Sequence, residues 1–392
     1  MIPPSVCDVL PPSSGCNSSH RQPVALSRPE IRPDRAGYGL PVAPPQQAVK
    51  QNAIAYAFQQ LKNNPREALH IAQRALAQSN NAHQRIHIVT LKARALFEVK
   101  RYNQCLSFIN ELPFKLQNQR TLCLAKGRAL QELERLPEAL DVFRPLYDKY
   151  SDSPKDEKIC GLALVRALQK DGRPAKLTEG LEILKQLRKR AANNKDDTPC
   201  HDKQIELALA RHLQQLEGKD NLQAALAILT TLRERATGHP QTPCHDKETE
   251  LALARLLQQM GGKNNLQAAM AILATLRERA TGHPQTPCHD KEIELALARL
   301  LQQMGGKNVL HTALAIFTRL RSQAAGGIPD TPCNDKNIEL ALGRHLQLMG
   351  DETYLQAALA IFTRLRAQAA GGRPNTPCDN KEIELALGRH YS

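Results

Sequence analysis

The 392-residue sequence lacks tryptophan, and Phe, Tyr and Trp together make up only 4% of it. β-Sandwiches and barrels draw on aromatic and β-branched residues, so this shortage, beside abundant Leu and Ala, argues against both classes. No apolar run approaches the roughly 18 residues of a membrane-spanning helix. The first residues, MIPPSVCDVLPPSSGC, have no basic stretch followed by an apolar one and do not indicate a secretory signal.

Catalytic motifs are also lacking. The sequence contains no Gly-rich phosphate loop, no nucleophile elbow, and no paired carboxylates beside a histidine in an irregular loop. Its acidic residues fall at expected helix starts or in exposed pairs such as Lys291 with Glu294, which is typical of a solvated face. We therefore expect no enzymatic activity and no cofactor.

Ten cysteines are present, five of which recur once per 44 or 45 residues: Cys200, Cys244, Cys288, Cys333 and Cys378. Equivalent positions of neighbouring repeats lie about 10 Å apart, too far for a disulfide, whose Cα atoms are about 4.4–6.8 Å apart. Reduced thiols and a cytoplasmic location follow. The Cys-His dipeptides lack the converging spacing of a zinc site, so we expect a role in capping loops and no metal. A helix N-terminus could still lower the pKa of these thiols.

Residues 1–49 form a separate region. Ten prolines, with Ser and Gly between them, interrupt any helix there. Such a segment cannot bury enough apolar surface to offset its conformational entropy, so it is predicted to be disordered. It could serve as a linker, a partner motif or an export signal.

Internal repeats dominate the rest of the chain. Residues 198–392 contain near-identical blocks that begin at offsets of 44, 44, 45 and 45 residues and end in a half-copy, and residues 50–197 read as a divergent form of the same unit. Each block predicts two helices joined by a turn. In the block 286–330, Thr286 is expected to be the N-cap and Pro287 the first helical residue. Gly305-Gly306 is expected to end the first helix, and Gly326-Gly327 with Pro329 the second.

The divergent blocks LKARALFEVKRYNQCLSFINELP (91–113) and AKGRALQELERLPEALDVFRPLY (125–147) carry a small residue in each helix, Ala93 with Cys105 and Gly127 with Ala139. Ala93 and Gly127 are 34 residues apart. This pattern resembles the tetratricopeptide repeat (TPR) family, in which positions 8 and 20 are small. The resemblance implies an all-α, right-handed α-solenoid of stacked helical hairpins, here eight hairpins and a final helix, with lengthened repeats in the C-terminal half.

An arginine follows position 8 in eight consecutive units: Arg94, Arg128, Arg166, Arg211, Arg255, Arg299, Arg344 and Arg389. In the TPR family, position 9 faces the concave groove together with positions 2, 5, 12 and 13. The resemblance thus implies an apolar stripe at position 5 and an amide ladder at position 12. These are Leu207, Leu251, Leu295 and Leu340, and Gln214, Gln258, Gln302 and Gln347.

Aligned guanidiniums suit an extended anionic ligand, since each offers a planar fork of donors to carboxylate or phosphate. One alternative is that each arginine pairs with an equally periodic glutamate: Glu206, Glu250, Glu294, Glu339 or Glu384. Another is that near-identical repeats copy every residue, useful or not. The divergent repeats keep Arg94, Arg128 and Arg166, which weakens the second alternative. Some members of the family bind the acidic C-terminus of chaperones through Lys and Asn at positions 5 and 9. This chain has Leu and Arg there, so the sequence does not support chaperone-tail binding.

The formal net charge is +14, of which residues 51–150 contribute +7 from fifteen basic and eight acidic residues. Such clustering attracts acidic partners and can bind nucleic acid non-specifically. RNA-binding proteins usually interleave aromatic residues for base stacking, and few occur here. We expect a protein-interaction scaffold that holds an acidic or extended peptide segment. Alternatives are a nucleic-acid-binding solenoid and an exported bacterial effector that acts by protein binding in another cell's cytosol.

The last unit, EIELALGRHYS, supplies a first helix without a second. A final helix that caps a stack should have a polar outer face, whereas Ile383, Leu385 and Leu387 are apolar. The sequence therefore predicts self-association through this half-repeat or a truncated product.

Overall fold

The computed structural model describes residues 46–78, 82–193, 199–240, 242–328, 331–370, 377–378 and 380–391. The chain divides into two units, residues 1–50 and 51–392. The predicted disorder of residues 1–49 falls mainly outside the described residues, but α1 begins at Gln46, so residues 46–49 are helical.

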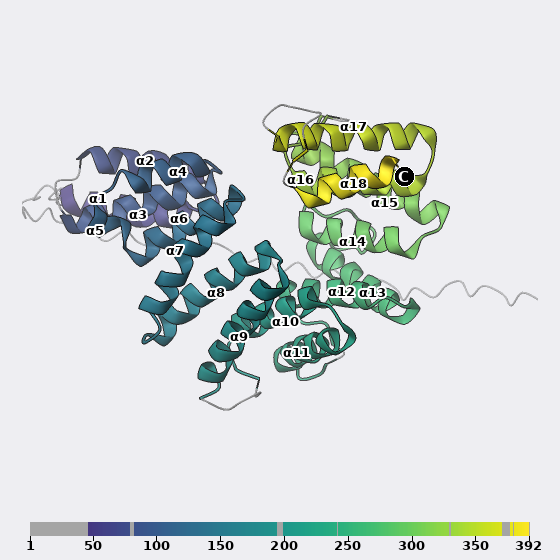
Figure 1. Cartoon of the computed structure of the whole chain (residues 1–392), viewed down its shortest axis with the longest axis horizontal. Coiled ribbons are helices and arrows are strands. Elements are labelled where there is room, and N and C mark those ends of the chain that lie inside the picture. Colours follow the sequence, from purple (N-terminus) through teal and green to yellow (C-terminus); the bar gives the residue numbers. More distant parts are fainter. Residues whose placement is uncertain are drawn as a thin grey trace, which may run out of the picture. The chain divides into compact units, whose positions relative to one another are not determined.

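Within the described ranges all regular structure is helical (Figure 1). The divergent part contains α1 (Gln46–Gln60), α2 (Pro65–Gln78), α3 (Ala82–Glu98), α4 (Tyr102–Asn110), α5 (Phe114–Gln117), α6 (Arg120–Glu132), α7 (Leu136–Lys149), α8 (Pro154–Asp171) and α9 (Pro174–Ala191). The near-identical part contains α10 (Lys203–Leu216), α11 (Lys219–Thr237), α12 (Lys247–Met260), α13 (Lys263–Thr281), α14 (Lys291–Met304), α15 (Lys307–Ala324), α16 (Lys336–Met349), α17 (Glu352–Ala369) and α18 (Lys381–Tyr391).

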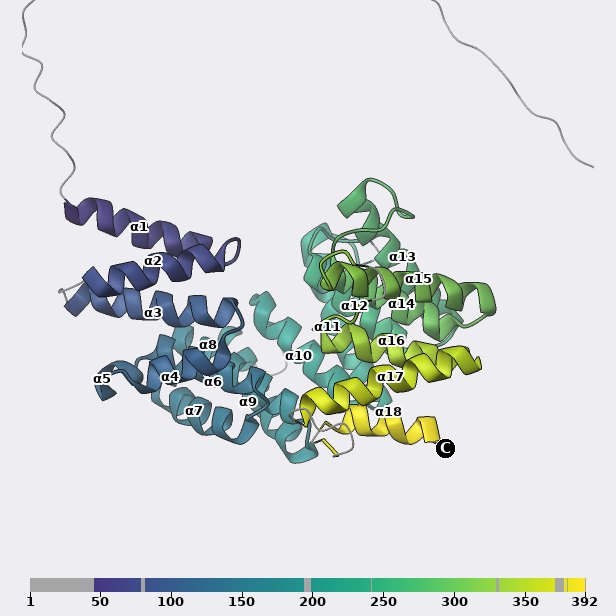
Figure 2. The same cartoon turned by 90° about the horizontal axis from the view of Figure 1, so that it is seen from above.

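These helices form the hairpins that the repeats predict. From α3 on, each first helix packs on its own second helix, and each second helix packs on the next first helix, as with α14, α15 and α16. Figure 2 shows the same succession for α16, α17 and α18. The all-α class and the stacked hairpins of a solenoid are confirmed, with eight hairpins followed by α18 in the described residues. The short helix α5 was not predicted.

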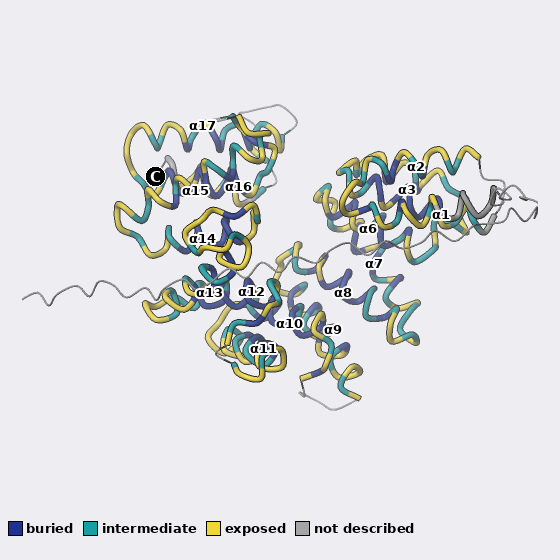
Figure 3. The backbone as a smooth tube through the Cα atoms, turned by 180° about the vertical axis from the view of Figure 1, so that it is seen from behind, coloured by how far each residue is buried: buried dark blue, intermediate teal, exposed yellow. Residues whose placement is uncertain are grey.

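The core lies between the helices rather than in one centre. Buried residues gather on the faces where successive helices meet, and exposed residues lie on the outer faces (Figure 3). Small residues permit close helix contact: a Cβ added to Gly127 would lie 2.4 Å from the Phe143 ring, and one added to Gly343 would lie 2.6 Å from Phe362. The spacing of small and large residues therefore sets how closely the two helices of a hairpin approach.

The helix ends partly differ from prediction. Helix α14 does end at Gly305-Gly306, whose φ angles of 72° and 87° favour glycine. Its start was predicted wrongly, because the N-cap is Asp290 rather than Thr286. The Asp290 carboxylate accepts the N–H groups of Glu292 and Ile293, so Thr286 and Pro287 lie in an irregular segment before the helix.

Candidate functional site

The arginine series lies on the first helices of successive units, α3, α6, α8, α10, α12, α14, α16 and α18. All of these side chains are exposed except Arg255, which is half-buried. We call these eight residues the arginine row.

Electrostatics show that members of the row are neighbours. Packing of neighbouring side chains partly desolvates the exposed Arg128 guanidinium and lowers its pKa, and the charges of Arg166 and Arg94 lower it further. Burial and the neighbouring charges of Arg255 and Arg344 lower the pKa of Arg299 in the same way. A guanidinium nevertheless stays charged near neutral pH. The row is therefore a line of mutually repelling cations, whose repulsion a bound anion would relieve.

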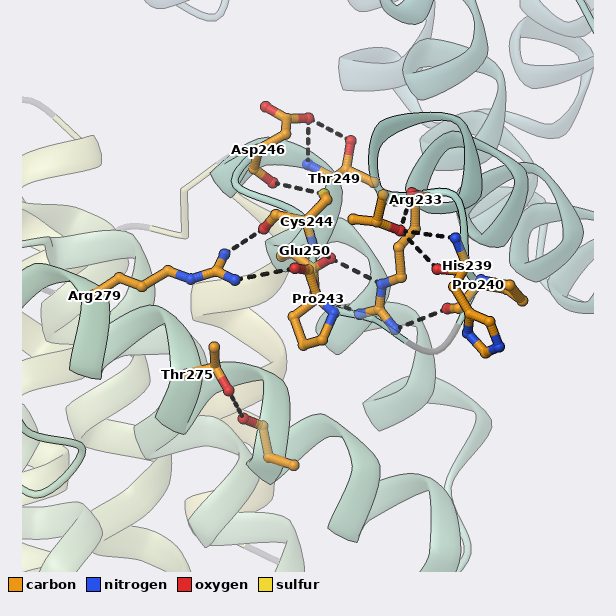
Figure 4. A network of polar contacts seen from close by, with 12 residues as sticks. Arg233, His239, Pro240, Pro243, Cys244, Asp246, Thr249, Glu250, Thr275 and Arg279 are labelled. Carbon is orange, nitrogen blue, oxygen red and sulfur yellow. Dashed lines mark hydrogen bonds and ion pairs between the residues drawn. The ribbon is translucent and has the colours of Figure 1, made fainter.

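The periodic glutamates do not pair with the row. They are held by arginines near the end of the preceding second helix, across distances of 2.7–2.9 Å, in the pairs Arg188–Glu206, Arg233–Glu250, Arg277–Glu294, Arg321–Glu339 and Arg366–Glu384. In Figure 4, Arg233 of α11 reaches Glu250 of α12 in this way. Pairing between these glutamates and the row is therefore wrong as an alternative.

Each of these glutamates also fixes the loop before its own helix. The Cys244 N–H donates to Glu250 Oε1 at 2.8 Å, and Arg279 donates to the Cys244 carbonyl (Figure 4). Burial alone would raise the pKa of Glu294, but hydrogen bonds from Arg277 and from the Cys288 N–H lower it overall. The Glu294 carboxylate therefore stays ionised, and the contacts of these glutamates join consecutive hairpins.

A different set of acids neutralises part of the row. Arg211 lies 3.7 Å from Glu248, and Arg344 lies 3.8 Å from Glu382, both at position 2 of the next first helix. Glu292 occupies the same position next to Arg255 and raises the pKa of that guanidinium, against the lowering effect of burial. Sequence reasoning missed these acids, although their 44-residue recurrence was visible. The equivalent residues elsewhere are neutral: Thr121, Ile159, Gln204 and Asn337.

The leucine ladder is a wrong prediction. Leu207, Leu251, Leu295 and Leu340 are only 3–8% exposed and belong to the core. The equivalent Leu385 of α18 is 60% exposed. Because no described helix packs beyond α18, this contrast shows that position 5 is normally covered by the next hairpin. These leucines hold hairpins together and cannot form an apolar stripe in a groove.

The predicted amide ladder lies one residue away from the predicted positions. Gln214, Gln258, Gln302 and Gln347 are half-buried. The Gln347 amide donates to the Ala386 carbonyl at 2.9 Å. The ordered ladder uses the next residue instead: the amides of Gln215, Gln259 and Gln303 donate to the carbonyls of Gln169, Gln214 and Gln258.

Two hollows open along the row. One, of about 460 Å³, is lined by Gln258, Arg299, Gln302, Gln303, Ala341, Arg344 and Leu348. The other, of about 370 Å³, lies in the divergent hairpins and is lined by Arg94, Phe97, Glu98, Arg120, Thr121, Leu124, Ala125, Arg128 and Ile159. Both place guanidiniums beside apolar side chains.

The five repeated cysteines, Cys200, Cys244, Cys288, Cys333 and Cys378, are buried or half-buried in the segments before the first helices. Burial raises the pKa of the Cys200 and Cys244 thiols to about 11, so the expected lowering by a helix N-terminus is wrong. No group of three potential His, Cys, Asp or Glu ligands occurs in the described ranges. These five cysteines anchor the capping loops, since the Sγ of each contacts a carbonyl oxygen two residues ahead, as Cys288 does at Asp290.

The apolar face expected at the end of the stack is mostly absent. Ile383 and Leu387 are 0% and 2% exposed, because they pack inward. Leu385 alone of the three is exposed, so self-association through this half-repeat stays a prediction with less apolar surface than expected.

No protein-family model matches the chain, and no curated protein matches it. Among solved structures, the chain is similar to a chain of the complex of Naa15/Naa10 bound to HypK-THB, with 16% identity and a TM-score of 0.28. That match covers 88% of this chain and 53% of the other, so this chain spans about half of its length. It is also similar to Nro1, described as a hypoxic regulator of sterol synthesis and a nuclear import adaptor, with 14% identity, a TM-score of 0.19 and coverage of 88% and 92%. Likeness at this level defines neither family nor function.

None of the helices in the described ranges combines the length and apolar character needed to cross a bilayer.

Proposed function

We propose that this chain is a non-enzymatic, TPR-like scaffold that binds an extended acidic segment of a partner protein along the arginine row. One observation carries the proposal: of the equivalent arginines in eight successive first helices, seven are exposed and Arg255 is half-buried, while other repeated arginines of the same chain are buried in pairs with glutamates. Guanidiniums that stay in contact with water can bind carboxylates supplied from outside.

Contacts other than charge would come from the two hollows rather than from the buried leucines. Ala341 and Leu348 line one hollow, and Leu348 is 53% exposed. Gln258 and Gln302 offer amide groups beside them. An extended peptide could therefore place alternate side chains on apolar and on cationic surface, as groove-bound peptides do.

Nucleic acid is the second candidate, supported by the net charge of +14. One feature favours a peptide. Glu248, Glu292 and Glu382 beside the row do not separate the two candidates, because they repel carboxylates and phosphates alike, whereas the residue composition does. Aromatic residues, on which unpaired bases stack, are few.

The proposal is tested by charge reversal. Arg211, Arg255 and Arg299 are replaced together by Glu, and the binding of a polyglutamate peptide is measured by fluorescence anisotropy. The matched control replaces Lys219, Lys263 and Lys307 by Glu, which changes the charge equally in the same three hairpins at exposed helix starts. We expect the arginine variant to lose binding and the lysine variant to retain it.

Two further measurements make the test decisive. Far-UV circular dichroism shows whether the variants keep their helices, and loss of helicity in the arginine variant would mean that the row is structural. The absorbance ratio at 260 and 280 nm of the purified protein reveals bound nucleic acid. Equal loss of peptide binding in both variants would reduce the row to non-specific charge.

A further inference from the structure

The arginine row is not chemically uniform along the chain. In the near-identical hairpins, three members have an acid at position 2 of the next first helix: Arg211, Arg255 and Arg344. Arg94, Arg128 and Arg166 instead face Thr121, Ile159 and Gln204. No described carboxylate comes within ion-pair distance of these three guanidiniums, although other arginines of the same hairpins, such as Arg120 and Arg135, are paired. The divergent hairpins therefore contain the strongest uncompensated charge of the row.

The hollow of about 370 Å³ lies at this charge. Arg94 and Arg128 line it, and Phe97, Leu124 and Ile159 supply its apolar wall. Arg120 also lines it, but its guanidinium forms an ion pair with Asp156. Arg94 lies with its guanidinium carbon 5.9 Å from the centre of the Phe58 ring.

The charges near this hollow leave a definite excess. Arg166 is close enough to Arg128 to lower its pKa, as Arg94 is, and burial lowers it most. Glu98 is the one carboxylate among the lining residues. The charge of Arg120 is already neutralised by Asp156. The guanidiniums of Arg94, Arg128 and Arg166 against the carboxylate of Glu98 leave two positive charges. A single carboxylate would neutralise half of this excess, whereas a phosphate monoester, with a charge of nearly −2 at neutral pH, would match it.

We propose that this hollow binds a phosphate monoester carried by a side chain of the partner's acidic segment. Arg94 and Arg128 hold the phosphoryl oxygens, Arg166 adds long-range attraction, and Phe97, Leu124 and Ile159 contact the carbon skeleton that bears the phosphate. Guanidinium forks pair with two phosphoryl oxygens at once, so two arginines can satisfy a phosphoryl group. The inference rests on the proposed function and adds the chemistry of one anchoring residue.

The test uses phenyl phosphate as the probe and benzoate as its singly charged counterpart, both titrated into the full-length protein by isothermal calorimetry. We expect phenyl phosphate to bind about tenfold or more tightly than benzoate, because its second negative charge adds a charge-assisted contact that benzoate cannot make. Its affinity should rise between pH 5 and 7.5, since the second ionisation of a phosphate monoester has a pKa near 6. Equal binding of benzoate, or no dependence on pH, would overturn the inference.

The variant Arg128→Gln should lose about tenfold or more in phenyl phosphate affinity, whereas Lys263→Gln, at an exposed helix start outside the arginine row, should lose little. If circular dichroism shows that Arg128→Gln fails to fold, Arg94→Gln serves in its place, because its guanidinium lies at the same hollow and is exposed. Equal losses in the two positions would contradict a site in the divergent hairpins.

Other sources of phosphate are separated by competition. The competitors are a phosphoserine peptide, a single-stranded oligonucleotide, whose diesters carry one charge each, and vesicles containing phosphatidic acid. If the oligonucleotide or the vesicles displaced phenyl phosphate more effectively than the peptide, the phosphate would not come from a protein side chain. Failure of phenyl phosphate to bind while polyglutamate still binds through Arg211, Arg255 and Arg299 would reject this inference alone. Loss of polyglutamate dependence on those arginines would reject the proposed function.

Discussion

At the scale of single residues, two sets of arginines with the same chemistry have opposite roles. Arg233 and Arg277 are 7% exposed and bind Glu250 and Glu294, which are 1% and 0% exposed. Arg211 and Arg299, which lie on the first helices α10 and α14, remain in contact with water. The difference arises because only the first set meets a carboxylate that also accepts a backbone N–H. Burial of an ion pair is tolerated when its remaining hydrogen-bonding groups are satisfied.

The first prediction concerns Glu250. Replacing it by Ala should lower the free energy of unfolding by about 3–5 kcal/mol, because the Arg233 guanidinium would be left buried without a counter-charge. The Cys244 N–H would lose its acceptor as well. The measurement is urea-induced unfolding followed by circular dichroism.

The control for this variant is Glu248→Ala, two residues earlier on the same helix. Glu248 is exposed and makes only long contacts with Lys203 and Arg211, of 3.9 and 3.7 Å, so its loss should cost about 1 kcal/mol or less. Similar losses for the two variants would show that the buried network does not join the hairpins.

The residue scale also shows the limit of sequence reasoning. The arginine row was predictable because its period identified it, and its exposure follows from the groove position that the TPR resemblance implies. The leucines at position 5 have the same period, yet they are buried, as the contrast between Leu295 and the exposed Leu385 shows. The next hairpin covers one side of each first helix, and the packing of three helices decides which side that is. The apolar pattern of a single helix does not reveal it.

At the scale of elements, buried polar groups lie where the second helix of one hairpin packs on the first helix of the next. We call these contacts joints. Two joints contain a buried histidine: His212 Nε2 donates to the Leu177 carbonyl at 2.6 Å, and His345 Nε2 donates to the Leu310 carbonyl at 2.9 Å. The equivalent residues at the two intervening joints are Leu256 and Leu300. The sequence predicted the hairpins and their turns but not these joints or the Asp290 cap. The TPCHD segment is too short to show a helical period, so its hydrogen bonds cannot be read from its pattern.

The second prediction follows from those histidines. Burial lowers the pKa of His212 and of His345, and the Nδ1 atom of each has no hydrogen-bond partner. The unfolded chain binds protons below its ordinary histidine pKa near 6.5, while the folded chain resists them. Their contribution to stability is therefore complete above about pH 6.5 and is lost as the pH falls below it.

This prediction is measured as the free energy of unfolding at pH 7 and pH 5. The double variant His212→Leu and His345→Leu copies the residue found at the other joints, and it should flatten the decline that the original chain shows. An identical pH profile for both proteins would mean that other groups cause the decline.

At the scale of the whole repeat array, the row would act as a ruler if its arginines hold separate carboxylates. Neighbouring packed helices lie about 10 Å apart, and an extended chain advances about 3.3 Å per residue. One acidic residue in about every three would therefore meet one arginine per hairpin. An electrostatic surface without register would depend only on total charge.

The third prediction uses this difference. A peptide with Glu at every third residue should bind several-fold to about tenfold more tightly than a peptide of identical composition whose glutamates form one block, since each charge-assisted contact adds affinity only where a guanidinium is within reach. Fluorescence anisotropy at physiological salt measures both affinities. In the variant with Arg211, Arg255 and Arg299 changed to Glu, the preference should disappear. If the original chain binds the two peptides equally, the arginines attract acidic partners as a diffuse positive surface, and the periodic spacing of the row reflects duplication of the repeat rather than recognition of a periodic ligand.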